Sequence, residues 1–221
     1  MTDANIILTK SIRDAVYEKL KDAILSEQYK PGHHLKEREL AKLYGISTTP
    51  LKEALRRLEQ EGLVTTSARR GTFVSTDIMN SIEEINWARS ALEGVAARLA
   101  ALKISDAEIS QLTGVVEQMR VFTEQKNAEK LLILNGDYHK LIRTFAKNNY
   151  IVQQIEAIHS FDRSFRQKAL SHEEELERGF QEHANIYRNI CARDADGAEQ
   201  AMISHIRRTI VFVKSSTEQS L

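Results

Sequence analysis

The stretch from Asp77 to Lys214 contains no proline, and its apolar residues recur at the three- and four-residue spacing of amphipathic helices. Proline inside a helix removes a hydrogen bond and clashes with the preceding turn, so a proline-free stretch of this length permits long helices. No alternating strand pattern interrupts it. We therefore predict an all-helical C-terminal part, a bundle of about six helices, at 78–102, 105–124, 128–146, 149–170, 172–192 and 196–214.

Two of these helices begin at capping-box patterns. Ser105 is followed three residues later by Glu108, and Ser171 by Glu174. In a capping box the serine hydroxyl and the glutamate carboxylate each accept a hydrogen bond from the backbone N–H of the other residue. Both serines are therefore predicted to cap the N-termini of their helices.

The N-terminal part has a different pattern, with shorter helical segments followed by β-prone residues. Gly45 suits the left-handed conformation that ends a helix, and Ser47 can cap the next helix. Pro50 falls in the first turn of that helix, where its missing N–H costs little. These signals predict helices at 11–25, 36–43 and 47–62, then strands at 63–66 and 72–75 on either side of a hairpin at 68–71.

The segment around Gly45 has the requirements of a helix-turn-helix. Such a pair of helices needs a small residue where the helices cross, supplied by Ala41, and a turn residue that tolerates positive φ, supplied by Gly45. A recognition helix meets base edges with its N-terminal residues, and a basic hairpin can lie along the DNA backbone as a wing. The alternative is a helical hairpin with a solvated charged face. The paired arginines of the hairpin favour DNA binding by Ser47, Thr48, Thr49, Lys52, Arg69 and Arg70.

Charge and composition restrict the function only weakly. The 221 residues include 31 basic and 31 acidic side chains, of which residues 1–76 hold 13 and 10. This mild asymmetry is compatible with a DNA-binding N-terminal domain. Cys191 is the only cysteine, so no intrachain disulfide is possible, and no apolar run approaches the length of a membrane span. We predict a soluble cytoplasmic protein with two domains, 1–76 and 77–221.

Three histidines stand on the core faces of separate predicted helices. His139, His183 and His205 lie among apolar residues at helical spacing, and Asn135 precedes His139 by one turn. Three imidazoles that converge would suit Zn²⁺ or a similar divalent ion, and Asn135 could add an amide oxygen. The alternative is three unrelated core histidines, each bonded to a carboxylate or a carbonyl, because spacing alone does not establish convergence.

Residues 11–75 contain a dense set of characteristic residues: Pro31-Gly32, Leu35, Glu37 to Ala41, Gly45-Ile46-Ser47, Pro50 to Leu55, Leu58, Glu61 to Val64, and Arg70 to Val74. In these residues the segment resembles the DNA-binding domain of the GntR family of bacterial regulators. The resemblance implies that Arg38, Ser47, Thr49, Lys52 and the wing from Arg69 to Gly71 lie at the DNA. Thr48 and Lys52 stand where the family usually has arginine, so the operator is expected to differ from the family's common ones.

Residues 77–221 contain a second set of characteristic residues: Arg89 to Glu93, Ala96 to Ala100, Tyr138 to Ile142, Asn148-Asn149, Glu182-His183 and Met202-x-x-His205-Ile206. In these residues the segment resembles the helical effector domain of the FadR subfamily, often called FCD. Metal-binding members carry Asp-x-x-x-His and two further histidines, and His139, His183 and His205 fall on the histidine positions. Asn135 occupies the aspartate position, and a neutral amide binds a cation more weakly. The resemblance implies a divalent metal, Zn²⁺ first and Ni²⁺ or Mn²⁺ as alternatives.

Such domains bind small organic acids, often through the metal and an arginine. Arg89 is the first candidate for this clamp, and Arg143, Arg163 and Arg166 are the others. The prediction is a mainly α protein, a homodimeric repressor that binds an operator in double-stranded DNA and responds to a carboxylate. The alternative is a metal-dependent hydrolase or lyase with an accessory DNA-binding domain, in which a metal-bound water is the nucleophile.

Overall fold

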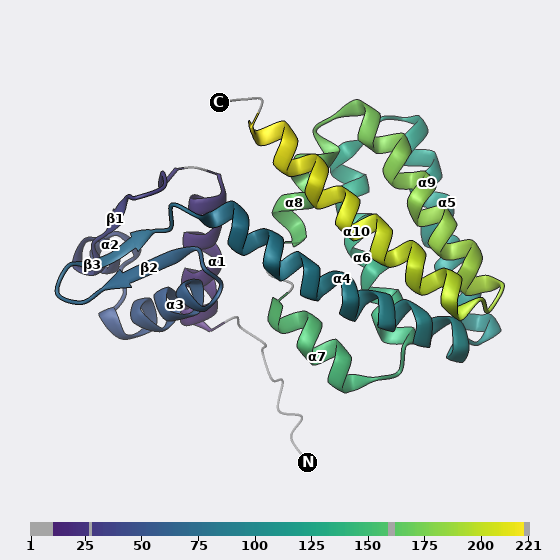
Figure 1. The fold of residues 1–221 in the computed structure, drawn as a ribbon, viewed down its shortest axis with the longest axis horizontal. Coiled ribbons are helices and arrows are strands. Elements are labelled where there is room, and N and C mark those ends of the chain that lie inside the picture. The colour runs from purple at the N-terminus through teal and green to yellow at the C-terminus, as the bar shows by residue number, and fades with distance from the viewer. Residues whose placement is uncertain (1–10, 27, 159–161, 219–221) are drawn as a thin grey trace, which may run out of the picture. The chain divides into compact units, whose positions relative to one another are not determined.

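The computed structural model describes residues 11–26, 28–158 and 162–218, apart from the side chains at 79, 81, 82, 162–165, 217 and 218. The chain divides into two compact units, with the boundary between residues 82 and 83 (Figure 1). Each unit has its own core, and the two are described separately.

The first unit has the helices and the hairpin that the sequence predicts, together with one additional strand. The strands form an antiparallel sheet in the order β1-β3-β2 (Figure 1). The two-residue strand β1 was not predicted, because two residues are too few to show an alternating pattern. The elements are α1 (Ile12–Leu25), β1 (His34–Leu35), α2 (Glu37–Tyr44), α3 (Thr48–Gln60), β2 (Val64–Ser67) and β3 (Gly71–Val74).

The turn between α2 and α3 confirms the helix-turn-helix. Gly45 has φ 65° and ψ 35°, the left-handed conformation that glycine adopts without steric cost. Ser47 occupies the N-cap position of α3, although its side chain makes no capping hydrogen bond. α3 packs on α1, and Leu51 and Leu58 of α3 and Leu20 of α1 are fully buried in the core. The fold of this unit is a winged helix-turn-helix.

A buried polar network joins α1 to the residues that follow α3. The Tyr17 hydroxyl donates to the Glu61 carboxylate at 2.6 Å, and the Lys21 ammonium donates to the Tyr17 hydroxyl at 3.1 Å. The Lys21 ammonium also lies 3.5 Å from Glu61, and the Arg57 guanidinium lies over the Tyr17 ring. Lys21 is only 1% exposed, and burial lowers the pKa of its ammonium to about 8, although the Glu61 charge opposes this shift.

Stability of this unit should therefore depend on pH through Lys21. The unfolded lysine titrates near 10.5, so between about pH 8 and 10.5 the unfolded chain binds more protons than the folded chain. Lys21 thus makes the free energy of unfolding rise with pH across this window, by up to roughly 3 kcal/mol. We expect the free energy of unfolding of Lys21→Met, measured by urea denaturation at about pH 7.5 and about pH 10, to lack the rise between these two pH values that Lys21 contributes. An equal change with pH in both proteins would contradict the assignment.

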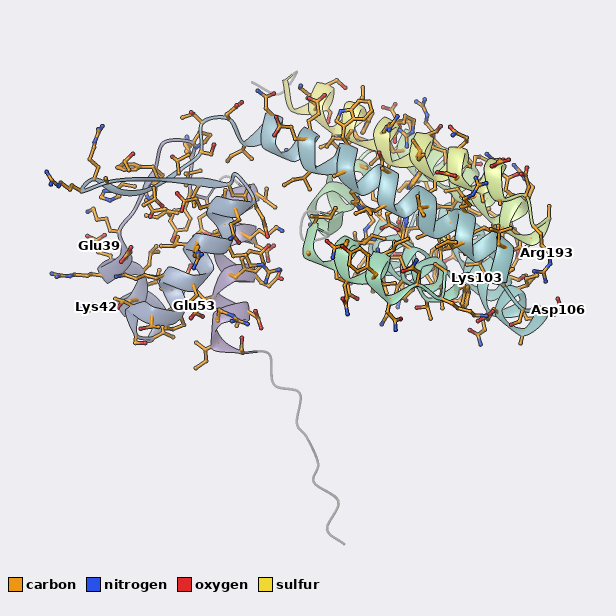
Figure 2. All side chains as sticks on the ribbon, turned by 60° about the horizontal axis from the view of Figure 1, so that its bottom comes forward. Glu39, Lys42, Glu53, Lys103, Asp106 and Arg193 are labelled. Carbon is orange, nitrogen blue, oxygen red and sulfur yellow. The ribbon has the colours of Figure 1, made fainter. Side chains whose placement is uncertain are left out.

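The second unit, as far as the structure describes it, consists of helices alone. Leu112, Tyr138, Ile142, Ile186 and Met202 are fully buried in its main core. At one end of the unit, Lys103, Asp106 and Arg193 lie near one another (Figure 2), and Arg193 is paired with Asp106 at 3.7 Å. The helices are α4 (Ile78–Lys103), α5 (Asp106–Glu124), α6 (Ala128–Phe145), α7 (Asn149–Ile158), α8 (Asp162–Leu170), α9 (Glu173–Cys191) and α10 (Ala195–Glu218).

The prediction of a single helix over 149–170 was wrong. Two helices, α7 and α8, occupy this stretch, on either side of residues 159–161, which lie outside the described residues. Their packing partners differ: Ile155 of α7 packs with Ala96 of α4 and Ala146, whereas α8 packs on α6, α9 and α10. One straight helix does not reach both sets of partners, and helical periodicity carries no information about this choice.

Of the two predicted capping boxes, the first is confirmed and the second was wrong. Ser105 and Glu108 make both hydrogen bonds of a capping box at the start of α5. The N-cap of α9 is instead His172, and the Ser171 hydroxyl donates to the Lys168 carbonyl at the end of α8. Because α8 ends directly before α9, Ser171 serves the C-terminus of one helix and not the N-terminus of the next.

Gly94 marks the close approach of α4 to α10. A Cβ at this position would lie 2.6 Å from Cγ1 of Ile203, whereas a Cβ at Gly114 in α5 would meet no atom within 4 Å. We expect Gly94→Ala to lower the free energy of unfolding by about 1–3 kcal/mol through overpacking. Gly114→Ala should raise it by about 0.5–1 kcal/mol, because alanine favours the helix. Thermal or urea unfolding measures both, and equal effects of the two variants would contradict the close approach.

Candidate functional site

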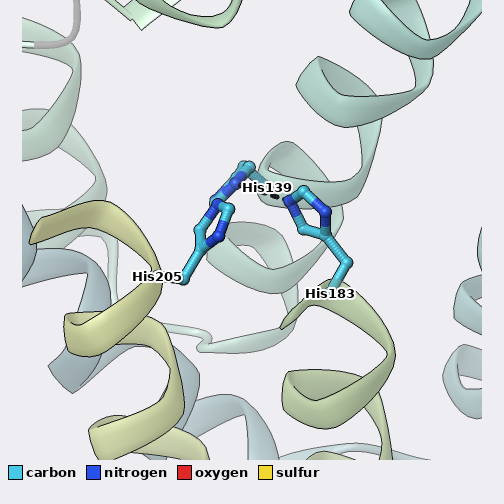
Figure 3. Close-up of side chains that lie close together, drawn as sticks. All are labelled: His139, His183 and His205. Carbon is cyan, nitrogen blue, oxygen red and sulfur yellow. Dashed lines mark hydrogen bonds between the residues drawn. The ribbon is translucent and has the colours of Figure 1, made fainter. Parts of the chain in front are cut away.

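The three predicted histidines converge in the core of the second unit. His139 of α6, His183 of α9 and His205 of α10 present ring nitrogens that all lie within 4.8 Å of one another (Figure 3). Nε2 of His139 and Nε2 of His183 are 3.4 Å apart, and the rings of His183 and His205 have centroids 4.4 Å apart. The side chains are 1%, 1% and 8% exposed in sequence order. The three histidines are therefore not unrelated core residues, although His205 is paired with the Glu182 carboxylate, as the alternative expected.

This geometry fits a divalent metal ion. Two nitrogens that are each about 2.1 Å from a tetrahedral Zn²⁺ lie about 3.4 Å apart, the separation of the His139 and His183 nitrogens. Asn135 is buried one helical turn before His139, and no hydrogen-bond partner for its Oδ1 is present among the described residues. An orphaned amide oxygen beside three imidazoles is a suitable fourth donor.

The environment of His183 keeps its imidazole neutral, as metal binding requires. Burial holds the pKa of His183 well below its usual range, and the nearby His205, Arg166 and Arg208 lower it further. A hydrogen bond with the Gly179 backbone, one turn earlier on α9, opposes the shift but does not overcome it. The neutral ring has one nitrogen free of a proton, and this nitrogen can coordinate a cation.

A second layer of charged residues surrounds His205. Its Nδ1 lies 2.7 Å from the Glu182 carboxylate, which leaves Nε2 as the ring nitrogen that can coordinate a cation. Burial raises the pKa of Glu182, but hydrogen bonds from His205 and Arg208 outweigh this effect and hold it below its ordinary value. Arg208 also donates to Glu175 at 2.6 Å. Glu182 therefore remains ionised and can hold the orientation of His205.

The roles of Glu182, Arg208 and Glu175 around His205 were not predicted from the sequence. Glu182 directly precedes His183, and Arg208 follows His205 by three residues, which places it on the same face of α10. The three-residue spacing from His205 could have identified Arg208 from the sequence. Glu175 could not be identified in this way, because its position near Arg208 depends on the packing of α9 against α10.

A cavity of about 40 Å³ adjoins the three histidines, which is enough space for a metal ion or a water molecule. Of the predicted effector-binding arginines, Arg89 and Arg166 line it. Arg143 does not line it: it is buried and donates to Glu93 at 2.8 Å, so its role is in the core. The side chain of Arg163 lies outside the described residues. The remaining lining includes Asn86, Asn135, Glu175, Arg208 and Thr209.

The predicted DNA-binding residues lie on the surface of the first unit. Arg38 of α2 is exposed, and so are Ser47, Thr48, Thr49 and Lys52 at the start of α3. The Lys52 ammonium is 3.7 Å from Glu37 of α2. Glu39, Lys42 and Glu53 are likewise exposed on α2 and α3 (Figure 2), so this surface carries both signs of charge.

The wing presents the two predicted arginines at its turn. Arg69 and Arg70 are exposed between β2 and β3, and Gly71 opens β3. Arg69 has φ 62°, a left-handed conformation that is uncommon for a residue with a Cβ. This conformation was not predicted from the sequence. Arg69 and Arg70 lie in the turn of the hairpin, beyond the last paired residues Ser67 and Gly71.

Comparison with known proteins agrees with both units. Residues 12–74 match the model of the bacterial regulatory proteins of the gntR family, and residues 84–208 match the FCD domain. The transcriptional repressor RspR of Escherichia coli K12 is 25% identical over 212 residues, which cover 96% of this chain and 93% of RspR. The Nta operon transcriptional regulator of Aminobacter aminovorans is 28% identical over 83% of this chain and 86% of its own length.

Solved structures show the same fold. McbR/YncC of E. coli superposes with a TM-score of 0.68 at 20% identity, covering 95% of this chain and all of McbR. A GntR regulator from Rhodococcus sp. RHA1 has a TM-score of 0.62 at 16% identity and covers 92% of this chain and 97% of its own. In the described part of the chain, no helix has the length and apolar character needed to cross a membrane.

These relatives are named as transcriptional regulators and not as enzymes, which confirms the predicted regulator over the metal-dependent hydrolase or lyase. The resemblance of residues 11–75 and 77–221 to the two domain families is also confirmed. The chain belongs to the gntR family of bacterial regulatory proteins and is a transcriptional regulator with an FCD domain.

Proposed function

We propose that this regulator binds a divalent metal and a small organic acid in its helical unit, and that the organic acid controls its affinity for DNA. The observation that carries the proposal is the convergence of His139, His183 and His205 beside a cavity lined by Arg89 and Arg166. A cavity that has both candidate metal ligands and guanidinium groups is suited to a carboxylate, because both features attract an anion.

The proposed metal ligands are His139, His183, His205 and the Asn135 amide oxygen. Zn²⁺ is the first candidate because imidazoles and four-coordinate geometry suit it, and Ni²⁺ or Mn²⁺ are alternatives. When bound, the ion would supply a positive charge that attracts a carboxylate oxygen of the acid. Arg89 and Arg166 are the proposed partners of the rest of the acid, and Glu182 orients His205.

The proposed partner of the first unit is double-stranded DNA with a pseudo-palindromic operator, bound by a homodimer in the bacterial cytoplasm. In winged helices of this kind, the N-terminal residues of the recognition helix contact base edges, here Thr48, Thr49 and Lys52 of α3. The acid is proposed to change the relative placement of the two DNA-binding units in the dimer. A coupling of 1–3 kcal/mol alters operator affinity by about 5- to 150-fold. Repression is the proposed response, since RspR is named a repressor.

The experiment that tests the metal site is elemental analysis of the untagged protein, before and after treatment with a chelator. We expect about one Zn, Ni or Mn ion per chain, removed by the chelator and restored by adding the ion. The restored protein is then screened against small carboxylic acids by thermal shift, where a binding acid raises the melting temperature. If no metal binds even in excess, the metal site is rejected, although the gntR assignment remains.

A further inference from the structure

All four candidate metal ligands in this cavity are electrically neutral. His139, His183 and His205 offer imidazole nitrogens, and Asn135 offers an amide oxygen. A divalent ion held by these donors alone would retain its full double charge in a buried site. Burial of an uncompensated charge is costly, because the protein interior screens and solvates charge far less than water does.

The carboxylates near the histidines already have cationic partners. Glu175 lines the cavity, but its oxygen accepts a hydrogen bond from Arg208 at 2.6 Å. Glu182 is paired with both Arg208 and His205 Nδ1. Neither acidic group is available to compensate a metal ion without breaking an existing ion pair.

The residues that line the cavity carry three guanidiniums, of Arg89, Arg166 and Arg208, to one described carboxylate, of Glu175. Arg208 is paired with Glu175 and Glu182, and Arg89 lies 3.7 Å from the buried Glu93, so these pairs compensate part of the positive charge. The net positive charge of the lining repels a metal ion and attracts an anion. The cavity therefore favours a metal and an anion together over a metal alone.

We infer that metal binding and carboxylate binding are strongly coupled in this protein, with the carboxylate of the organic acid supplying the negative charge that Asn135 does not. This inference rests on the proposed function and adds a condition to it: the metal binds weakly until an anion enters the cavity. Because coupling is reciprocal, the metal raises the affinity for the carboxylate by the same factor, of the order of 5- to 150-fold.

The test replaces Asn135 with aspartate, a substitution that preserves the shape of the side chain and adds one negative charge to the donor set. ZnCl₂ is titrated by calorimetry into the full-length metal-free protein, in sodium chloride or in sodium acetate of equal ionic strength. The dissociation constants are corrected for the weak binding of acetate to Zn²⁺. Gln153→Glu adds the same charge at an exposed position on α7 and is the control. Circular dichroism verifies that each variant is folded.

For the wild type and Gln153→Glu, we expect acetate to tighten Zn²⁺ binding by about 5-fold or more. For Asn135→Asp, we expect Zn²⁺ binding in chloride at least about tenfold tighter than for the wild type, with little further gain from acetate. Zn²⁺ affinity in the wild type that is equal in chloride and acetate would overturn the coupling and leave the metal site intact. An equal gain from acetate in Asn135→Asp would also overturn it. No Zn²⁺ binding by any of the proteins would reject the metal site itself.

Discussion

Replacing His183 with alanine is expected to remove the bound metal. The imidazole is 1% exposed, and its Nε2 lies 3.4 Å from that of His139, so no other described ring can take its place. Loss of a residue that only orients a metal ligand typically costs 10- to 100-fold in affinity, and loss of the ligand itself should exceed about 100-fold. Elemental analysis after dialysis against a defined free concentration of the metal measures the loss.

Two further variants make this result specific. His205→Ala should also lose the metal, because its ring lies 4.4 Å from that of His183, centroid to centroid. His172→Ala removes a histidine that contacts Phe212 outside the cluster, and it should keep the metal. Metal content is the deciding measurement, because each buried histidine can also affect stability through packing. Undiminished metal in His183→Ala would reject this residue as a ligand.

Substitutions at the DNA-binding surface are expected to have the second large effect, a loss of operator affinity. Arg38→Ala and Lys52→Ala should each weaken operator binding by about 5- to 150-fold if the side chain contacts a base edge. If it contacts a phosphate instead, the loss should be similar for all sequences, and the slope of affinity against salt should fall by about one. Both side chains are exposed, so neither substitution should unfold the protein. The double substitution of Arg69 and Arg70 by alanine should reduce the salt slope further.

The measurement uses a duplex that the wild-type protein selects from a random DNA pool. Fluorescence anisotropy at several salt concentrations then gives the affinity and the salt dependence. Arg188→Ala removes an exposed cation from α9 of the helical unit and is the matched control. Unchanged affinity for both Arg38→Ala and Lys52→Ala would reject the proposed recognition surface, and a loss with Arg188→Ala would indicate a nonspecific effect of net charge.

The helix-turn-helix could be predicted closely because its signals are local. Gly45 ends α2 in the left-handed conformation, and Ser47 stands at the N-cap position of α3, as the sequence predicts. Glycine, caps and helical periodicity act within a few residues, so they can be recognised without the rest of the fold. The errors occurred where two elements compete for a residue, as at Ser171, or where a stretch has two sets of packing partners, as at 149–170.

The candidate site shows most clearly which properties the sequence determines and which depend on the tertiary structure. The sequence by itself determined which side chains could serve as ligands, and it determined that Asn135 brings no charge to the donor set. Only the tertiary structure decided that the three imidazoles meet, that Arg89 and Arg166 line the cavity, and that Arg143 is paired in the core. Spacing along one helix sets the direction of a side chain, but the distance between side chains on α6, α9 and α10 depends on how those helices pack.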